Sequence, residues 1–210
     1  MCGMLDIFMN IVDVYILNTQ LVKNNIDFVL NFVDEKRKIK ALKFVQEKDQ
    51  FLSLGAGYLI KKYLQYEEIL ETKTGKPYLK NGPYFNISHS GEYVVLVKHE
   101  TREVGVDIER INETKLDAIR YVLSDKEKSV IDTNILFLMW SNKESLIKCL
   151  SSGIQDIKIV SGLPLEGARS INNENFYTRS QIFDNYSLSV TLKGSEPFNI
   201  AIKPIADLEE

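Results

Sequence analysis

The sequence contains a weak internal repeat. No other feature of the sequence restricts the possible folds of the chain as much. An Asp in an alternating strand pattern, a helix start and a mixed acidic and basic run follow one another near residues 12–36 and again near residues 106–126. Helices ending in similar segments, residues 58–61 and 145–148, complete the two copies. The repeat predicts two similar α+β halves joined near residue 102, an N-terminal half of residues 1–102 and a C-terminal half of residues 103–210.

The two copies differ at positions that could carry charge. Glu109 and Glu144 in the second copy correspond to Tyr15 and Gly57 in the first. Acidic ligands would therefore occur in the C-terminal half alone. The repeat thus predicts one site and not two.

Composition narrows the class of protein and its partners. The 210 residues carry a formal net charge of −3, which argues against a general nucleic-acid binder. The two cysteines, Cys2 and Cys149, form no disulfide framework or metal pattern, which fits a reducing compartment. No apolar run approaches the ~18 residues of a membrane-spanning helix. We expect a cytoplasmic protein with no nucleic-acid partner and no membrane partner.

The apolar pattern predicts both strands and helices along the chain. Alternating or continuous short apolar runs predict strands over residues 11–18, 85–87, 93–99, 103–108, 157–160, 176–183, 186–191 and 198–202. Spacings of three and four predict helices within residues 24–48 and over residues 49–66, 116–123, 126–129 and 136–150. The residues after 203 are expected to form a loose tail.

Two carboxylates, Asp107 and Glu109, lie two residues apart in a predicted strand. Side chains at this spacing point to the same face of a strand. Neighbouring carboxylates repel each other, so their proximity suggests a cation that relieves the repulsion. The alternative is an acidic strand end that lies in water.

A third acid, Glu144, lies in a helical row with Trp140 and Lys148. An ordinary surface pair of Glu and Lys is the alternative. However, the row begins with the only Trp of the chain, and Trp side chains are rarely found on surfaces that have no function. Together with Asp107 and Glu109, Glu144 could form a site for a hard cation that faces an anion. Mg²⁺ favours such a site, because it combines few carboxylates with waters and phosphate oxygens.

Several other groups could bind phosphate. Residues 88–91 (SHSG) are expected to form a turn with two hydroxyls, an imidazole and exposed N–H groups. Arg37 and Lys40 share a face of a basic helix, and Lys76 is expected to be exposed in a turn. A polar turn and a solvated helix surface are the alternatives for the first two.

Taken together, these motifs resemble those of the 4′-phosphopantetheinyl transferases. The motifs occur in the same order: GKP at residues 75–77, FNISHS at 85–90, GVDIE at 105–109 and WxxKESxxK at 140–148. The match spans roughly residues 30–150 and is to the larger, monomeric class, which activates peptide and polyketide synthases. It implies a pseudo-two-fold α+β fold with the active site in the cleft between the halves.

The resemblance also implies substrates, a cofactor and residue roles. Coenzyme A would be the donor, a serine of an apo acyl or peptidyl carrier protein the acceptor, and Mg²⁺ the cofactor. Asp107, Glu109 and Glu144 would be the Mg²⁺ ligands. Lys148 would contact the diphosphate, and Lys76 would lie at the adenine end. The contacts to the 3′-phosphate would come from Arg37, Lys40, Ser53, Ser88 and His89.

The expected reaction is an attack of the carrier serine on the β-phosphate of coenzyme A, which releases 3′,5′-ADP. The catalytic residues would be Asp107, Glu144 and Lys148, with Lys148 assisting the leaving group. Glu144 is the first choice for the general base, and a water molecule held by the metal is the second. The carrier protein is expected to meet the enzyme near Lys115, Arg120 and the loop after Lys148.

The chain departs from the family pattern at two places. Leu52 stands where the family often has Arg, and residues 149–153 (CLSSG) replace a Gly-rich stretch. Two other functions stay open: a coenzyme A-binding relative without catalysis, and another Mg²⁺-dependent phosphoryl-transfer enzyme. The sequence contains no P-loop pattern that would favour the latter.

Overall fold

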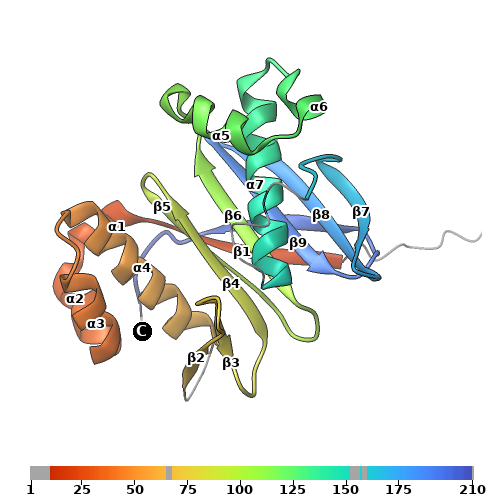
Figure 1. The fold of residues 1–210 in the computed structure, drawn as a ribbon. Coiled ribbons are helices and arrows are strands. Elements are labelled where there is room, and N and C mark those ends of the chain that lie inside the picture. The colour runs from red at the N-terminus through yellow and green to blue at the C-terminus, as the bar shows by residue number, and fades with distance from the viewer. Residues whose placement is uncertain (1–9, 65–67, 152–156, 158–159, 210) are drawn as a thin grey trace, which may run out of the picture.

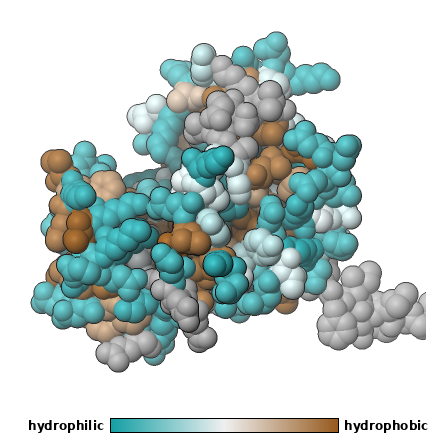
Figure 2. Space-filling model, turned by 60° about the horizontal axis from the view of Figure 1, so that its bottom comes forward, coloured by the Kyte–Doolittle hydropathy of each residue, from teal (hydrophilic) through white to brown (hydrophobic). Residues whose placement is uncertain are grey.

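The computed structural model describes residues 10–64, 68–151, 157 and 160–209. It has two halves, each with a four-stranded sheet and helices packed against it (Figure 1). The expected α+β class with two sheet-containing halves is confirmed. In the described part of the chain, no helix is both long and apolar enough to cross a membrane. The face of the molecule shown in Figure 2 is mostly hydrophilic, with apolar side chains in small groups.

The first sheet has the strand order β10-β1-β5-β4. Its strands are β1 (Asn10–Asn18), β4 (Tyr84–Ser90), β5 (Tyr93–His99) and β10 (Phe198–Pro204). The helices of this half are α1 (Thr19–Asn24), α2 (Ile26–Phe32), α3 (Glu35–Leu42) and α4 (Glu47–Leu64). A short hairpin of β2 (Ile69–Glu71) and β3 (Pro77–Leu79) follows α4, and the GKP segment runs from its turn into the first residue of β3.

The second sheet has the strand order β6-β9-β8-β7. Its strands are β6 (Val104–Arg110), β7 (Glu166–Ile171), β8 (Glu174–Phe183) and β9 (Tyr186–Lys193). The long helix α7 (Thr133–Leu150) packs across β6, β9 and β8 (Figure 1). A 3₁₀ turn, η1 (Glu113–Lys115), and two short helices, α5 (Leu116–Val122) and α6 (Asp125–Lys128), connect β6 to α7.

The end of the chain crosses into the first sheet. Strand β10 pairs in parallel with β1, although it follows the second sheet in the sequence. The residues after 203 are not the loose tail that we expected, because the Ile205 N–H donates to the Ile16 carbonyl (2.9 Å) and the Tyr58 hydroxyl donates to the Glu209 carbonyl (3.1 Å). The division near residue 102 stays a prediction, and β10 joins the two parts.

Strand β5 is buried on both faces because it lies between the helices and the second sheet. Val94 and Leu96 belong to the apolar core with α4, whereas Val95 and Val97 belong to the core shared with β6 and β9. Alternate side chains of a strand point to opposite faces. This position explains the continuous apolar run YVVLV, which is typical of a strand covered on both sides.

Side chains of β4 take the place of a backbone ladder where the two sheets meet. Strand β6 pairs with β9 on one side, so the N–H groups on its other edge need partners. Three bonds satisfy them, from Val106 to Asn86 (3.0 Å), from Ile108 to Ser88 (3.4 Å) and from Arg110 to Ser90 (3.0 Å). The predicted turn over residues 88–91 is therefore wrong for residues 88–90, which belong to β4. We call this contact between β4 and β6 the seam.

Helix α7 lies close to β6 because Gly105 has no side chain. A Cβ atom at this position would lie 2.0 Å from the Ser145 carbonyl oxygen and 2.5 Å from the Cys149 nitrogen. Small residues continue the contact along the helix, since Ser141 bonds Ser189 (2.8 Å) and Ser145 bonds Thr191 (2.9 Å). This close approach brings the later turns of α7 next to the carboxylates of β6.

The other predicted elements agree with the structure to differing degrees. The strand over residues 93–99 matches β5, and the helix over residues 136–150 begins three residues earlier, at Thr133. The structure adds α1, β2, β3 and β7, which were not predicted. The predicted strand over residues 157–160 includes two positions that lie outside the described residues.

We expect Gly105→Ala to destabilise the protein by about 3 kcal/mol or more, because the added methyl group would overlap backbone atoms of α7 that cannot move independently. Gly75→Ala is the matched control. Gly75 has a φ of +81° but no neighbour within 4 Å, so this change should cost only about 1 kcal/mol. Urea unfolding of both variants measures the difference, and equal losses would contradict the proposed packing of α7.

Candidate active site

The carboxylate of Asp107 is the centre of the site. Asp107 lies on β6, and the residue is 5% exposed. One carboxylate oxygen, Oδ1, accepts hydrogen bonds from the Ser88 hydroxyl (2.9 Å) and the Lys148 ammonium (2.6 Å). The other, Oδ2, is buried and has no hydrogen-bond partner among the described residues. A buried carboxylate oxygen without a partner is costly, so Oδ2 is suited to a ligand.

Three elements from both halves meet at this carboxylate. Ser88 comes from β4, Asp107 from β6 and Lys148 from the last turn of α7. Lys148 Nζ also donates to Ser88 Oγ (3.0 Å). The Ser88 hydroxyl therefore donates its proton to Asp107 and accepts from Lys148. This closed arrangement fixes the ammonium group at the seam.

Glu144 lies one helical turn before Lys148 on α7. Its Oε1 atom is buried and has no partner in the part of the chain that the structure describes. Burial first, and then the negative charge of Asp107, raise the pKa of Glu144 to about 7, while Lys148 opposes the rise and Glu109 adds to it. A carboxyl with this pKa can both hold and release a proton near neutral pH.

Glu109 lies two residues beyond Asp107 on the same strand, as predicted. Its carboxylate is bound by the ammonium of Lys115, which belongs to η1. Burial raises the pKa of Glu109, and the bond to Lys115 opposes that rise. The three acids are close enough to influence one another, since Asp107 and Glu109 both act on Glu144.

The donor atoms fit a divalent cation in part. Within residues 10–64, 68–151, 157 and 160–209, no three acidic, His or Cys side chains are already arranged around a common metal position. Asp107 Oδ2 and Glu144 Oε1 are nevertheless two buried carboxylate oxygens without partners. A hard cation such as Mg²⁺ takes such oxygens and completes its shell with water. Glu109 is already paired with Lys115 through Oε1, so a cation would either share its carboxylate with Lys115 or displace it.

The predicted phosphate contacts lie at different places in the structure. His89 follows Ser88 on β4, so its side chain points to the opposite face of the strand, and it is exposed. Ser53 is buried in α4, and its hydroxyl has no partner among the described residues. The sequence predicted these three residues as one contact set with Arg37 and Lys40, and the structure spreads the five over β4, α4 and α3.

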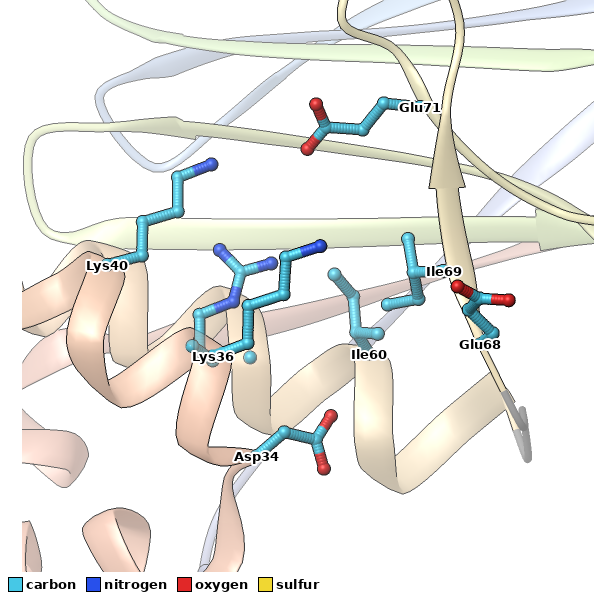
Figure 3. A pocket seen from close by; sticks show the side chains of 9 residues that line it. Asp34, Lys36, Lys40, Ile60, Glu68, Ile69 and Glu71 are labelled. Atoms are coloured by element: carbon cyan, nitrogen blue, oxygen red, sulfur yellow. The ribbon is translucent and has the colours of Figure 1, made fainter.

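Arg37 and Lys40 line a pocket of ≈ 250 Å³ beside α3. Figure 3 shows Lys36 and Lys40 extending from α3 toward the side where Glu71 lies on β2. The stem of Arg37 passes over Gly57, where a Cβ atom would lie 2.5 Å from Arg37 Cγ. Gly57 therefore makes room for the arginine at the wall of this pocket.

Lys76 lies between the hairpin and the end of α7. Its Nζ atom donates to the carbonyl oxygens of Cys149 (3.4 Å) and Val104 (3.5 Å), and burial lowers its pKa. The expectation of an exposed turn lysine is therefore wrong, because the side chain is half-buried. Lys76 and Lys148 line a second pocket, of ≈ 220 Å³, together with Asn86.

The sequence analysis missed a buried ion pair next to the site. Lys143 Nζ lies 3.0 Å from Glu127 Oε2, and the two side chains are 0% and 2% exposed. Lys143 also donates to the carbonyl of Val122 (3.3 Å), and Glu127 forms a capping box with Ser124 at the start of α6. The pattern Ser-x-x-Glu before an apolar helix is typical of this box and could have revealed it. The pair holds α7 to α5 and α6 at the residue before Glu144.

Two family models match consecutive parts of the chain. The model described as 4′-phosphopantetheinyl transferase, N-terminal, matches residues 20–101, and the 4′-phosphopantetheinyl transferase superfamily model matches residues 103–202. The chain belongs to the 4′-phosphopantetheinyl transferase superfamily. The resemblance of the sequence motifs to this family is thus confirmed.

Relatives in the superfamily carry the same type of name. The chain is 33% identical over 153 residues to 4′-phosphopantetheinyl transferase gsp of Aneurinibacillus migulanus, covering 63% of this chain and 64% of the relative. It is 25% identical over 142 residues to 4′-phosphopantetheinyl transferase Sfp of Bacillus subtilis (strain 168), covering 60% and 63%. The matches therefore span less than two thirds of the length of these two relatives.

We expect Glu144→Gln to stabilise the protein at alkaline pH when divalent cations are removed. Folding raises the pKa of Glu144 from 4.5 to about 7. The free energy of unfolding therefore falls as the pH rises through that interval, because the carboxyl ionises more easily in the unfolded chain. Gln avoids this cost. The variant should gain at most about 3 kcal/mol near pH 8.5 and little near pH 4. Urea unfolding in EDTA at both pH values measures the gain, and equal gains would show that the charge of Glu144 does not oppose folding.

Proposed function

We propose that this protein transfers the 4′-phosphopantetheine arm of coenzyme A to a serine of an apo acyl or peptidyl carrier protein and releases 3′,5′-ADP. The observation that carries the proposal is the meeting of Ser88, Asp107 and Lys148 at the seam. An ammonium group held there beside unpartnered carboxylate oxygens suits a diphosphate that is bound together with a cation. Membership in the superfamily supports the same reaction.

Mg²⁺ would be held by Asp107 and Glu144, with Glu109 as a third ligand once Lys115 has left it. When bound, the ion would neutralise charge on the diphosphate and act as a Lewis acid.

Lys148 would bind the diphosphate and stabilise the departing 3′,5′-ADP. During the transfer, a bond forms between the carrier serine oxygen and the β-phosphorus, and the bond from that phosphorus to the oxygen of 3′,5′-ADP breaks. Such transfers depend on position and charge more than on covalent help from the protein. Ser88 and Asp107 supply the position, because both are bonded to the Lys148 ammonium.

Glu144 would take the proton from the attacking serine hydroxyl. Its pKa of about 7 places it in the range of an effective base near neutral pH, and its Oε1 atom has no competing partner among the described residues. If Glu144 instead serves only as a ligand, a water molecule would take the proton. These two roles are alternatives, since one carboxylate cannot easily perform both.

The binding residues for the rest of coenzyme A stay predictions. Arg37 and Lys40 would contact the 3′-phosphate, in a pocket that acidic side chains also line. Lys76, which shares a pocket with Lys148, would lie at the adenine end. Ser53 and His89 complete the predicted contacts, although Ser88 is already used by the seam. The carrier as partner, the monomeric state and the cytoplasmic location also remain proposals.

Mass spectrometry of several apo carrier proteins tests the proposed function. After incubation with the protein, coenzyme A and Mg²⁺, a carrier should gain the mass of one phosphopantetheine group, and EDTA should prevent the gain. Release of inorganic phosphate without this gain would favour another phosphoryl-transfer enzyme. Binding of coenzyme A without modification of any carrier would favour a relative that has lost catalysis.

We expect Lys148→Met to lower kcat about 100-fold, as for the loss of one transition-state donor, and also to destabilise the protein. The loss of stability follows because Asp107 would stay buried without its cation. The double variant Asp107→Asn with Lys148→Met removes both charges, so it should regain stability but not activity. Urea unfolding and steady-state kinetics separate the two effects, and recovery of activity in the double variant would contradict a catalytic role for Lys148.

A further inference from the structure

The ion pair of Glu109 and Lys115 occupies the outer edge of the proposed cation site. Glu109 shares a face of β6 with Asp107, and the Lys115 ammonium is bonded to Glu109 Oε1. The ammonium group of Lys115 thus holds the carboxylate of Glu109, which the proposed function assigns to the divalent ion. The pair lies within the site and not merely near it, since Asp107 also acts electrostatically on Glu109.

The backbone after β6 places Lys115 over Glu109. Asn112 begins the 3₁₀ turn, and its side chain accepts from the Thr114 N–H (3.0 Å) while its carbonyl accepts from the Lys115 N–H (3.0 Å). These bonds shape the turn so that Lys115 lies back over the strand it has just left. The contact therefore follows from local structure.

The two partners differ in their exposure to water. The side chain of Lys115 is 48% exposed, whereas that of Glu109 is 15% exposed. Lys115 can itself enter solvent, because its side chain is already half exposed, but its departure would leave the carboxylate of Glu109 largely buried without a partner. Glu109 would then need another cation.

Two of the three carboxylates of the proposed cation site are paired with lysines. Asp107 is paired with Lys148, and Glu109 is paired with Lys115. Asp107 Oδ2, on a residue that is 95% buried, and Glu144 Oε1 have no partner among the described residues, which is the independent sign that a ligand belongs there. A cation bound between them would face Glu109 while Lys115 still held it.

We propose that Lys115 is a built-in competitor for the divalent cation and that it sets the affinity of the site by holding Glu109. This inference rests on the cation site of the proposed function and adds a residue that tunes it. Coupling of this kind is reciprocal: Lys115 lowers the affinity for the cation, and bound cation releases Lys115 from Glu109. Lys115 is thus a positioning residue for Glu109 and is not itself catalytic.

Direct binding of Mn²⁺, measured by electron paramagnetic resonance with and without coenzyme A, tests the first half of the coupling. Lys115→Met should bind Mn²⁺ about tenfold more tightly than the unchanged protein. Lys115→Arg keeps the charge and should bind as the unchanged protein does. Lys128→Met is the control, because Lys128 is 45% exposed and forms a surface ion pair with Asp125.

Labelling of lysines with an acetylating reagent tests the second half. Added Mg²⁺ should increase acetylation of Lys115, read by mass spectrometry of peptides, and leave Lys128 unchanged. If Lys115 served only to stabilise the fold, neither the Mn²⁺ affinity nor the effect of Mg²⁺ on acetylation would change.

Three outcomes would overturn the inference. These are equal Mn²⁺ affinity in Lys115→Met and the unchanged protein, an equal gain in Lys128→Met, and no Mn²⁺ binding in any variant. The transfer of phosphopantetheine to a carrier is measured separately, so these outcomes leave the proposed function to its own test.

Discussion

The buried negative charge of Asp107 is the constraint on which the rest of the structure depends. A carboxylate that is 5% exposed must be paired or hydrogen-bonded, because removing a charge from water is costly. Here the pairing groups come from both halves, Ser88 from β4 and Lys148 from α7. The halves are therefore joined by the group that the proposed reaction needs. The remaining oxygen, Oδ2, stays available for a ligand.

The seam makes this arrangement possible because it joins two sheets without merging them. If β4 and β6 shared a backbone ladder, their side chains would point above and below one continuous sheet. Instead, Asn86, Ser88 and Ser90 satisfy the β6 edge through their side chains. The hydroxyl of Ser88 then faces Asp107 directly. Gly105 contributes from the other side, because its missing side chain lets α7 bring Glu144 and Lys148 close.

Local periodicity predicted part of the site and failed where distant contacts decide. The spacing of Asp107 and Glu109 predicted a common face, and the helical row placed Glu144 and Lys148 together on α7. The polar segment at residues 88–90 indicated a turn, since Ser and Asn favour turns when no partner strand is known. The segment is a strand because it pairs with β5. Its hydroxyls bind the free edge of β6, about 20 residues away in the sequence. Local pattern likewise does not indicate that β10 crosses to β1.

The weak repeat gains a physical meaning from the positions where the two copies differ. In the C-terminal half, Glu144 directs a carboxylate toward β6, whereas its counterpart Gly57 admits the stem of Arg37. Tyr15, the counterpart of Glu109, stacks on Tyr63 with ring centroids 3.8 Å apart and contributes to the apolar core. One copy thus supplies acids, and the other a pocket that Arg37 and Lys40 line together with charged residues of both signs. If coenzyme A binds as proposed, its diphosphate would contact one copy and its 3′-phosphate the other, so that the two copies would form one site.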